Sequence, residues 1–250
     1  MSGRQPSAAT IATRSLFRAC KVLDAAAMAD ALKRGANVHA KDRQRRHPLG
    51  AFIQAWQRAP TPPPPAPFLE LFTAHGADLA RPEGGRDPRH TVDFLQGKDE
   101  EMPLLGALSD GGMDLGDRIY DGRLLTRVVR NRAPDMLFCL LGSDFDVDPD
   151  AQDEDNQTAL HALVDARVYP DGRPDDTVAE MMDILFDGCA SDKIPDICRR
   201  TALDRFAQEA PELLEAWDAL KRERRAMLDC IHLDDALPEA EAEEGQQRRL

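Results

Sequence analysis

The chain has 250 residues, which is enough for one large domain, two small ones or an array of repeats. Its formal charge of −13 argues against binding nucleic acid through phosphate contacts, because such binding needs Lys and Arg clustered on one face. Five cysteines without a C-x-x-C spacing argue against a disulfide framework and a zinc cluster, and favour a reducing compartment.

Two short helices are predicted at the start of the chain. The first covers Ser15–Leu23 and the second covers Asp24–Gly35, with Asp24 as its N-cap and Gly35 ending it in a left-handed turn. A polar loop follows, and then the next helix. The predicted unit is therefore two short antiparallel helices, a glycine stop and a polar finger.

The stop after the second helix recurs along the chain. Gly76-Ala-Asp-Leu lies 41 residues after Gly35, and Gly112-Met-Asp-Leu lies 36 residues further on. Weaker copies follow at 144–147 and 188–190. Proline-rich insertions at 58–67 and 169–176 lengthen two units, and both fall between a first and a second helix.

A turn that leads into a helix start also recurs. The stretch from Asp153 through Thr158 to His161 has its counterpart 43 residues later, at 196–206, and a fainter one at 42–52. A turn-then-helix unit that repeats at such intervals is the signature of a solenoid.

These motifs resemble the ankyrin-repeat family, whose unit reads roughly D-x-x-G-x-T-P-L-H-x-A, then a second helix, then G-A-D-V-N. Asp153, Asn156, Thr158, Leu160 and His161 stand at its D, G, T, L and H positions. The resemblance implies an all-α fold, an ankyrin-like helical solenoid of about six divergent helix-turn-helix repeats with short hairpin or finger loops.

The sequence departs from the family pattern at several points. Gly122 is expected to be the turn glycine of an intervening repeat, whereas Arg45, Asn156 and Arg199 replace that glycine elsewhere. The unit between 81 and 114 is hardly recognisable. We expect a flexible N-terminus at 1–12, a repeat domain at 13–232 and an acidic disordered tail at 233–250. Within the domain, 211–220 should form the last second helix, which 221–231 extends or caps.

The residues that could suggest a catalytic or metal-binding site each have a structural explanation. In ankyrin-like units a histidine such as His161 hydrogen-bonds between turns, and no nucleophile stands at a recognisable spacing from it. The acidic stretch Asp144–Asp155 does not fit an EF-hand, which needs Gly at its sixth position, where Pro149 stands. The histidines lack zinc spacing and the glycine pairs lack a phosphate-binding motif. We therefore expect neither a metal nor a cofactor.

What the resemblance implies is binding to another protein, through a concave face made of the fingers and the first helices. Finger 43–46 is positive and finger 144–155 is negative, which would steer a polarised partner, or would merely keep the chain soluble. The residues carried over as partner-binding are Arg43, Gln44, Arg46, Tyr120, Asp121, Arg123, Gln152, Glu154, Asp155, Gln157, Ile197 and Arg200. Cys198 lies in the same turn as Ile197.

The sequence thus favours a monomeric module without catalysis that binds a protein, by its acidity a basic one, and neither nucleic acid nor membrane. Its Ala/Arg/Asp-rich composition suggests a bacterial source, and so an immunity-type neutraliser or a secreted effector. It would act in the cytoplasm, or in a host cell if exported. Two alternatives remain open. One is an enzyme with a site in segment 81–109, where Asp87, His90 and Asp93 cluster, and the other is a structural adaptor in a larger assembly.

Overall fold

The computed structural model describes residues 7–79, 91–113, 118–142, 145, 147–166 and 176–235. For 92–93, 118–121 and 228–235 the backbone alone is described. Within these ranges the chain forms eleven α-helices and two short 3-10 helices. The described residues contain no β-strand, and one isolated bridge joins Pro195 to Thr201. The all-α prediction is confirmed.

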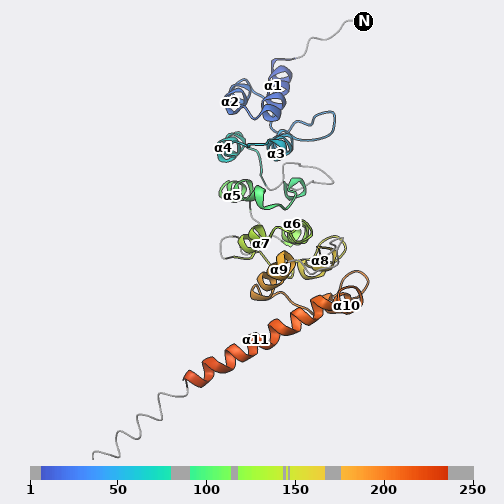
Figure 1. The fold of residues 1–250 in the computed structure, drawn as a ribbon. Helices are drawn as coiled ribbons and strands as arrows, with labels where there is room; N and C mark the ends of the chain where they lie inside the picture. Colours follow the sequence, from blue (N-terminus) through green and yellow to red (C-terminus); the bar gives the residue numbers. More distant parts are fainter. Residues whose placement is uncertain are drawn as a thin grey trace, which may run out of the picture.

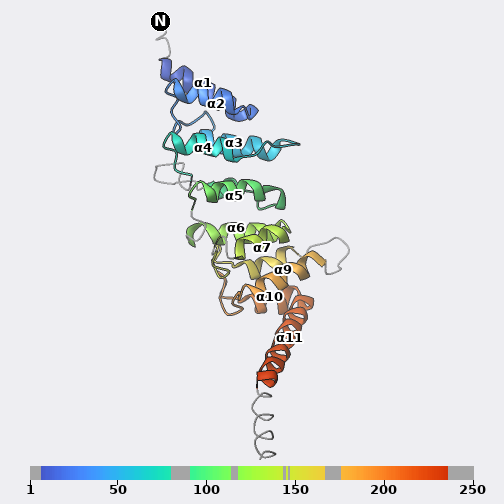
Figure 2. The same ribbon diagram turned by 90° about the vertical axis from the view of Figure 1, so that its left-hand side faces the viewer.

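The helices stack in two parallel layers, which Figure 1 shows end-on and Figure 2 from the side. The first layer holds α1 (Ala8–Val22), α3 (Pro48–Arg58), α6 (Arg118–Arg130), α8 (Ala159–Ala166) and α10 (Ala202–Glu209). The second layer holds α2 (Ala25–Lys33), α4 (Ala66–Ala74), α5 (Met102–Asp110), α7 (Pro134–Leu141), α9 (Asp176–Asp187) and α11 (Pro211–Asp235). Two 3-10 helices, η1 (Thr91–Phe94) and η2 (Asp99–Glu101), take the place of a first helix in the third unit.

Each helix packs on its partner and on the equivalent helix of a neighbouring unit. α1 contacts α2 and α3, α8 contacts α6, α9 and α10, and α4 contacts α2 and α5. The pairs make six units in one row, as predicted. Such an array is held together by burial between neighbours, without one central core.

Local sequence explains where the helices begin and end. Asp24 Oδ1 accepts a hydrogen bond from the Ala27 amide at 2.9 Å, which caps α2. Gly35, Gly76 and Gly112 have φ angles of +83°, +81° and +92° directly after α2, α4 and α5. Only glycine adopts this left-handed conformation without steric cost, so the predicted glycine stops are confirmed.

Among the described residues the third unit has no regular first helix, and a buried carboxylate organises residues 96–101. Glu101 is 3% exposed, and its Oε2 accepts the backbone amides of Gln96 at 2.8 Å and Gly97 at 2.7 Å. The Gln57 amide of α3 donates to Oε1 of the same carboxylate. Asp99 Oδ1 in turn accepts from the Met136 amide at 2.8 Å, in the first turn of α7. The carboxylates of Glu101 and Asp99 therefore accept backbone amide hydrogen bonds here, whereas backbone carbonyls accept them inside a helix.

The ends of α1 and α11 differ from the expected segment bounds, and the position of Gly122 corrects one expectation. α1 begins at Ala8, inside the N-terminal segment expected to be flexible, because Ser7 Oγ accepts the Thr10 amide at 3.2 Å and caps it. Gly122 lies inside α6, so it is no turn glycine. α11 continues to Asp235, past the expected end of the domain at 232, and projects beyond the array (Figure 1). The rest of the predicted tail, 236–250, lies outside the described residues.

Candidate partner-binding face

Three loops on the first-helix side share one backbone construction; we call them finger one (42–46), finger two (153–157) and finger three (196–200). In each finger the first and fifth residues are joined by an N–H to C=O hydrogen bond of 2.8–2.9 Å. The fourth residue has a positive φ: +61° at Arg45, +55° at Asn156 and +61° at Arg199. These are the positions where the family pattern has glycine, so the fingers keep that turn geometry without its usual residue.

An aspartate at the start of each finger fixes this shape. Asp42 Oδ1 accepts the amides of Gln44 and Arg46 at 2.8 and 3.0 Å. Burial raises the pKa of Asp42, but the hydrogen bonds from the side chain and backbone of Arg46 outweigh it and hold the pKa below its usual value. Asp153 accepts the equivalent amides in finger two, and Asp196 accepts the Arg200 amide in finger three. The finger backbones are therefore satisfied before any partner arrives.

Fingers two and three brace each other. The Ile197 amide donates to the Asp155 carbonyl at 3.0 Å. The Gln152 side chain donates to the carbonyls of Asn156 and Pro195 at 2.8 and 3.1 Å. The exposed side chains of this pair, including Ile197 at 63% exposure, therefore stand on a rigid support.

The predicted partner-binding residues divide into three groups. Exposed side chains on the fingers and on Gln152 beside finger two are Arg43, Gln44, Gln152, Glu154, Asp155 and Ile197. Half-buried side chains that hold the fingers or helices together are Arg46, Arg123, Gln157 and Arg200. Tyr120 and Asp121 lie in α6 instead of a finger, and their side chains are outside the described part of the chain.

Two of these half-buried residues, Arg46 and Arg200, hold finger one and finger three to the helices that follow them. Arg46 binds Asp42 at 2.8 Å and Gln54 at 2.6 Å. Arg200 binds Glu209 at 2.9 Å and Asp196 at 3.3 Å. Each guanidinium ties the last residue of a finger to its first residue and to the helix that follows, because one planar group can reach two acceptors.

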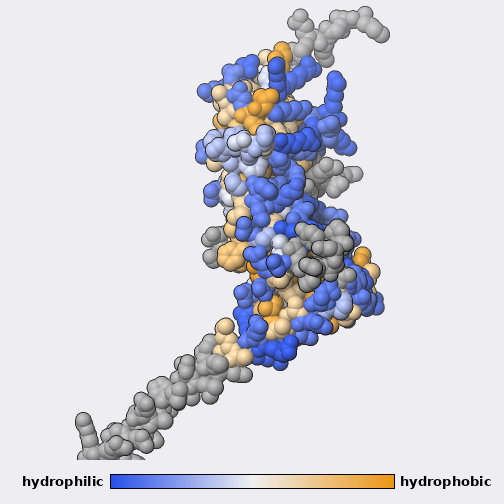
Figure 3. All heavy atoms as spheres, viewed as in Figure 1, coloured by the Kyte–Doolittle hydropathy of each residue, from blue (hydrophilic) through white to orange (hydrophobic). Residues whose placement is uncertain are grey.

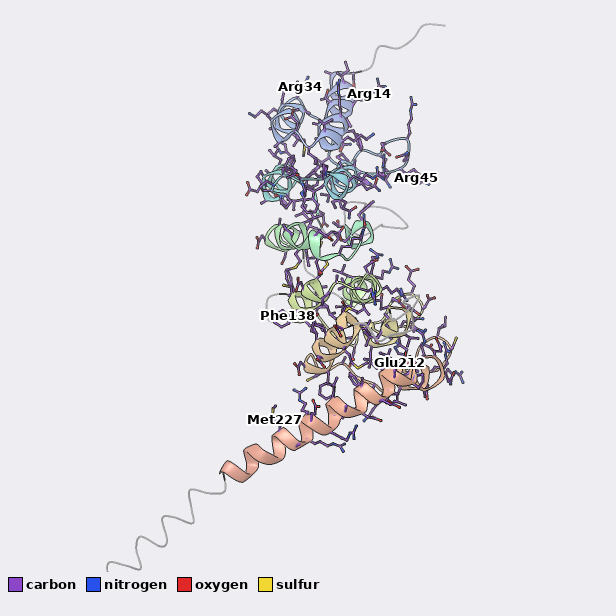
Figure 4. All side chains as sticks on the ribbon, viewed as in Figure 1. Arg14, Arg34, Arg45, Phe138, Glu212 and Met227 are labelled. Carbon is purple, nitrogen blue, oxygen red and sulfur yellow. The ribbon has the colours of Figure 1, made fainter. Side chains whose placement is uncertain are left out.

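A groove of about 880 Å³ runs beside finger one. Its rim carries Lys21 from α1, Arg43 from the finger and Arg58 from α3, and its floor includes Ala51 and Ala55. Figure 4 shows the finger projecting sideways from α3, with Arg45 at its tip.

A second hollow, of about 460 Å³, opens between α3, η1, α6 and finger two. Gln54, Gln57, Arg58, Phe94, Gln96, Arg123 and Glu154 line it. Arg123 and Glu154 form an ion pair across it at 3.3 Å. Three of these seven residues are glutamines, and their amide groups are partly occupied, since Gln57 donates to Glu101 and Gln54 accepts from Arg46.

Charges in the C-terminal half are largely paired with one another. Arg130 lies 3.4 Å from Asp153 and 3.3 Å from Asp165. Arg205, which is 5% exposed, lies 3.0 Å from Asp165 and 3.1 Å from Glu209. The network joins α6, finger two, α8 and α10, so much of the acidity there is neutralised locally.

His161 is fully buried and its hydrogen bonds are those of a structural residue. Its Nε2 lies 3.1 Å from the Arg200 carbonyl, to which only a protonated nitrogen can donate. Nδ1 then accepts from Thr158, whose hydroxyl is 2.9 Å away. Burial lowers the pKa of His161, with a smaller contribution from Arg205, and the Arg200 carbonyl and Asp196 only partly oppose the shift. The side chain joins α8 to finger three, as the structural interpretation predicted.

The structure also adds residues that the sequence analysis missed. Gln54 and Arg58 of α3 line both hollows beside the predicted fingers. They lie four residues apart, which places them on one helix face next to the finger. The sequence could have indicated them, since the first helices were expected to line this face. The predicted partner-binding residues, however, came from the finger positions alone.

The described residues provide no support for the alternative of an enzyme with a site in segment 81–109. Asp87 and His90 lie outside them, and so does the side chain of Asp93. Among the residues described, no group of three or more His, Cys, Asp or Glu is placed to hold a metal ion. No described helix combines the length and the apolar character needed to cross a membrane.

Comparisons with known proteins agree with this architecture. No family model matches the sequence, and no curated protein matches it either. The ankyrin repeat protein EF0377 superposes with a TM-score of 0.62 at 18% identity, over 82% of this chain and 96% of its own. An ankyrin repeat domain from Acinetobacter baumannii AYE gives 0.57 at 16% identity, over 82% and 96%.

A third similar structure comes from a complex. One chain from the complex of the predatory endopeptidase Bd0816 of Bdellovibrio bacteriovorus with the immunity protein Bd3460 has a TM-score of 0.54 at 18% identity. The match covers 82% of this chain and 97% of that one. The protein therefore has the ankyrin-repeat fold. Within that fold the described helices form six divergent units, and in the third unit the described residues form η1 and η2 where the other units have a first helix.

Proposed function

We propose that this chain is a non-catalytic module that binds a protein partner through the face formed by the fingers and the first helices. The observation that carries the proposal is the construction of fingers two and three. Their backbones are internally hydrogen-bonded and tied to each other, while Glu154, Asp155 and Ile197 stay exposed. Side chains on a preorganised support lose little conformational entropy on binding, which favours affinity.

The polarity of the chain supports a partner with a basic patch opposite finger two. Glu154 keeps 72% of its side chain exposed although it pairs with Arg123, and no acceptor role within the described residues occupies the Asp155 carboxylate. Ile197 adds an apolar contact beside them. An exposed carboxylate pair next to one apolar anchor suits a Lys- or Arg-bearing surface, where charge steers the encounter and the apolar contact slows dissociation.

Within this function we favour a neutraliser of a bacterial enzyme over a secreted effector, with action in the cytoplasm as a monomer. The likeness to a chain from an endopeptidase–immunity protein complex supports the neutraliser, and so does a net charge suited to a basic target. The test is direct. An enzyme encoded next to this chain should be inhibited on mixing with it, at a one-to-one ratio.

The binding face is tested by comparing two sets of variants in the same capture assay. Glu154→Gln/Asp155→Asn/Ile197→Ser should reduce capture of the partner at least tenfold. Glu70→Gln/Glu180→Gln removes the same number of charges from exposed positions on α4 and α9 and should leave capture unchanged. Undiminished capture by the finger variant, or equal loss in both sets, would show that the partner binds elsewhere.

A further inference from the structure

Positive charge is concentrated in the first two units, against the sign of the whole molecule. Residues 7–59 contain ten Lys and Arg but three Asp and Glu, a formal charge of +7 in a chain of −13. All three carboxylates are occupied locally. Asp24 caps α2, Asp30 lies 2.8 Å from Arg34, and Asp42 lies 2.8 Å from Arg46. The excess cations of this end are therefore not neutralised by its own acids.

Several of these cations surround the groove beside finger one. Lys21, Arg43 and Arg58 come from three different elements and meet at its rim. None of the three is held by a hydrogen bond or ion pair to the residues that the structure describes. Asp42 is the one acidic residue in the described lining, and Arg46 already binds it.

The floor of the groove is aliphatic and shallow. Ala51, Ala55 and Ala59 leave room for small side chains, and Val22, which is 65% exposed, adds an apolar edge next to Leu23. In Figure 3 hydrophilic and apolar surface lie side by side at this end of the array. An apolar strip between cationic rims fits a segment that carries both carboxylates and small apolar side chains.

The tip of finger one adds a further cation at an energetic cost. Arg45 has a left-handed backbone, φ +61°, which costs an L-residue about 1–2 kcal/mol relative to a right-handed conformation. Its side chain points away from the array (Figure 4). Strain at an exposed charged tip is the kind of feature that accompanies a binding function.

We propose that the groove beside finger one binds an acidic segment of a partner protein. Its small apolar side chains would lie on the alanine floor, and its carboxylates would meet Lys21, Arg43 and Arg58. This inference deepens the proposed function, on which it rests, by adding a second contact of opposite sign to the one at finger two. Two contacts of opposite sign would fix the direction in which a partner lies along the array.

A nucleic acid is the competing polyanion, and the groove suits it less. No aromatic ring lines the described groove, so bases would have no surface to stack on. The rest of the chain is strongly negative and would repel a long phosphate backbone. A short acidic peptide is affected less, because salt screens charges beyond about 8 Å at physiological ionic strength.

The test uses a fluorescein-labelled 12-residue peptide of Glu, Ala and Leu, titrated with the full chain and followed by fluorescence anisotropy. Arg43→Ala/Arg58→Ala should weaken binding about tenfold, since two solvent-exposed ion pairs at ~0.7 kcal/mol each give that factor. Lys33→Ala/Arg34→Ala removes the same charge from the same end of the chain, outside the groove, and should change the dissociation constant less than twofold. The peptide with Gln for Glu should not bind.

Three results would overturn the inference. Equal weakening by both pairs of substitutions would show that binding depends on net charge alone. An absence of binding at the highest concentration of the full chain would show that the groove does not bind this peptide. Tighter binding of a 12-nucleotide single strand would assign the groove to nucleic acid. Thermal midpoints within 2 °C of each other would confirm that the variants fold. The finger-two variant should bind the peptide normally, so a failure of the proposed partner face and a failure of this groove are distinguishable.

Discussion

Gly122→Ala should destabilise the protein, although alanine is the better helix former. Gly122 lies in α6, and a β-carbon added there would approach the Gln152 carbonyl oxygen to 2.4 Å and its amide nitrogen to 2.8 Å. Both obstacles are backbone atoms of the segment that leads into finger two. They cannot swing aside as a flexible side chain could, so α6 and the next unit must separate.

The expected size follows from two opposing effects. Replacing Gly by Ala inside a helix contributes about 0.8–1 kcal/mol of stability when the site has space. Forcing an extra carbon into a packed contact costs about 1–3 kcal/mol, and backbone contacts belong at the upper end. The net loss is then about 1–2 kcal/mol, or a fall in Tm of roughly 2–8 °C for a chain of this size.

Gly106→Ala is the matched control. Gly106 lies in α5, and a β-carbon there has no neighbour within 4 Å, so this variant should gain up to about 1 kcal/mol. Urea unfolding followed by circular dichroism measures both changes, and hydrogen exchange should show faster opening of 152–157 in Gly122→Ala only. If Gly122→Ala is as stable as Gly106→Ala, the close approach of the two units is wrong.

Three further predictions concern single side chains. Lowering the pH from 7.5 to 5.5 should destabilise the wild type more than His161→Gln, because burial lowers the pKa of His161 in the folded state below 6.5. The stability that the neutral imidazole contributes is present above pH 6.5 and is lost as the pH falls toward the folded-state pKa. Urea titrations at both pH values give the difference, and parallel losses would refute it. Arg45→Gly and Arg199→Gly should each stabilise by about 0.5–1 kcal/mol in thermal melts, since the left-handed turn is then unstrained; a lower Tm in either would contradict this. Glu101→Gln should cost about 1–3 kcal/mol, because Oε2 accepts the amides of Gln96 and Gly97 while Oε1 accepts from Gln57, and one amide oxygen cannot replace both. Hydrogen exchange at 94–101 that matches the wild type would contradict this.

Local rules were enough to predict most of the fold. Gly35, Gly76 and Gly112 marked the ends of second helices because glycine alone takes their conformation freely. Thr158 with His161, and Thr201, marked the starts of α8 and α10 through caps that need no tertiary contact. Periodic stops and caps together set the number of units before any contact was known.

Features that depend on contacts between units could not be predicted in this way. Gly122 matched the family spacing, yet it is required by the approach of the Gln152 backbone, which no local pattern reveals. Arg46 and Arg200 lie in polar loops, and the sequence did not reveal that they bind Gln54 and Glu209, which lie eight and nine residues further along the chain. Such pairings determine which charged groups remain available to a partner. Composition alone therefore overstated the acidity of finger two.

The described residues of the third unit that precede α5 form only η1, η2 and the turn between them, and this has a mechanical consequence. Across this point α3 and α6 both contact η1, and η2 contacts α5 and α7. A short loop clamped by one carboxylate resists bending less than a pair of packed helices does. Under tension, or during thermal opening, we expect the array to part at this point into an electropositive segment and an electronegative one. Thermal fluctuation there would also vary the angle between the two, so a partner that spans both would stiffen the whole rod.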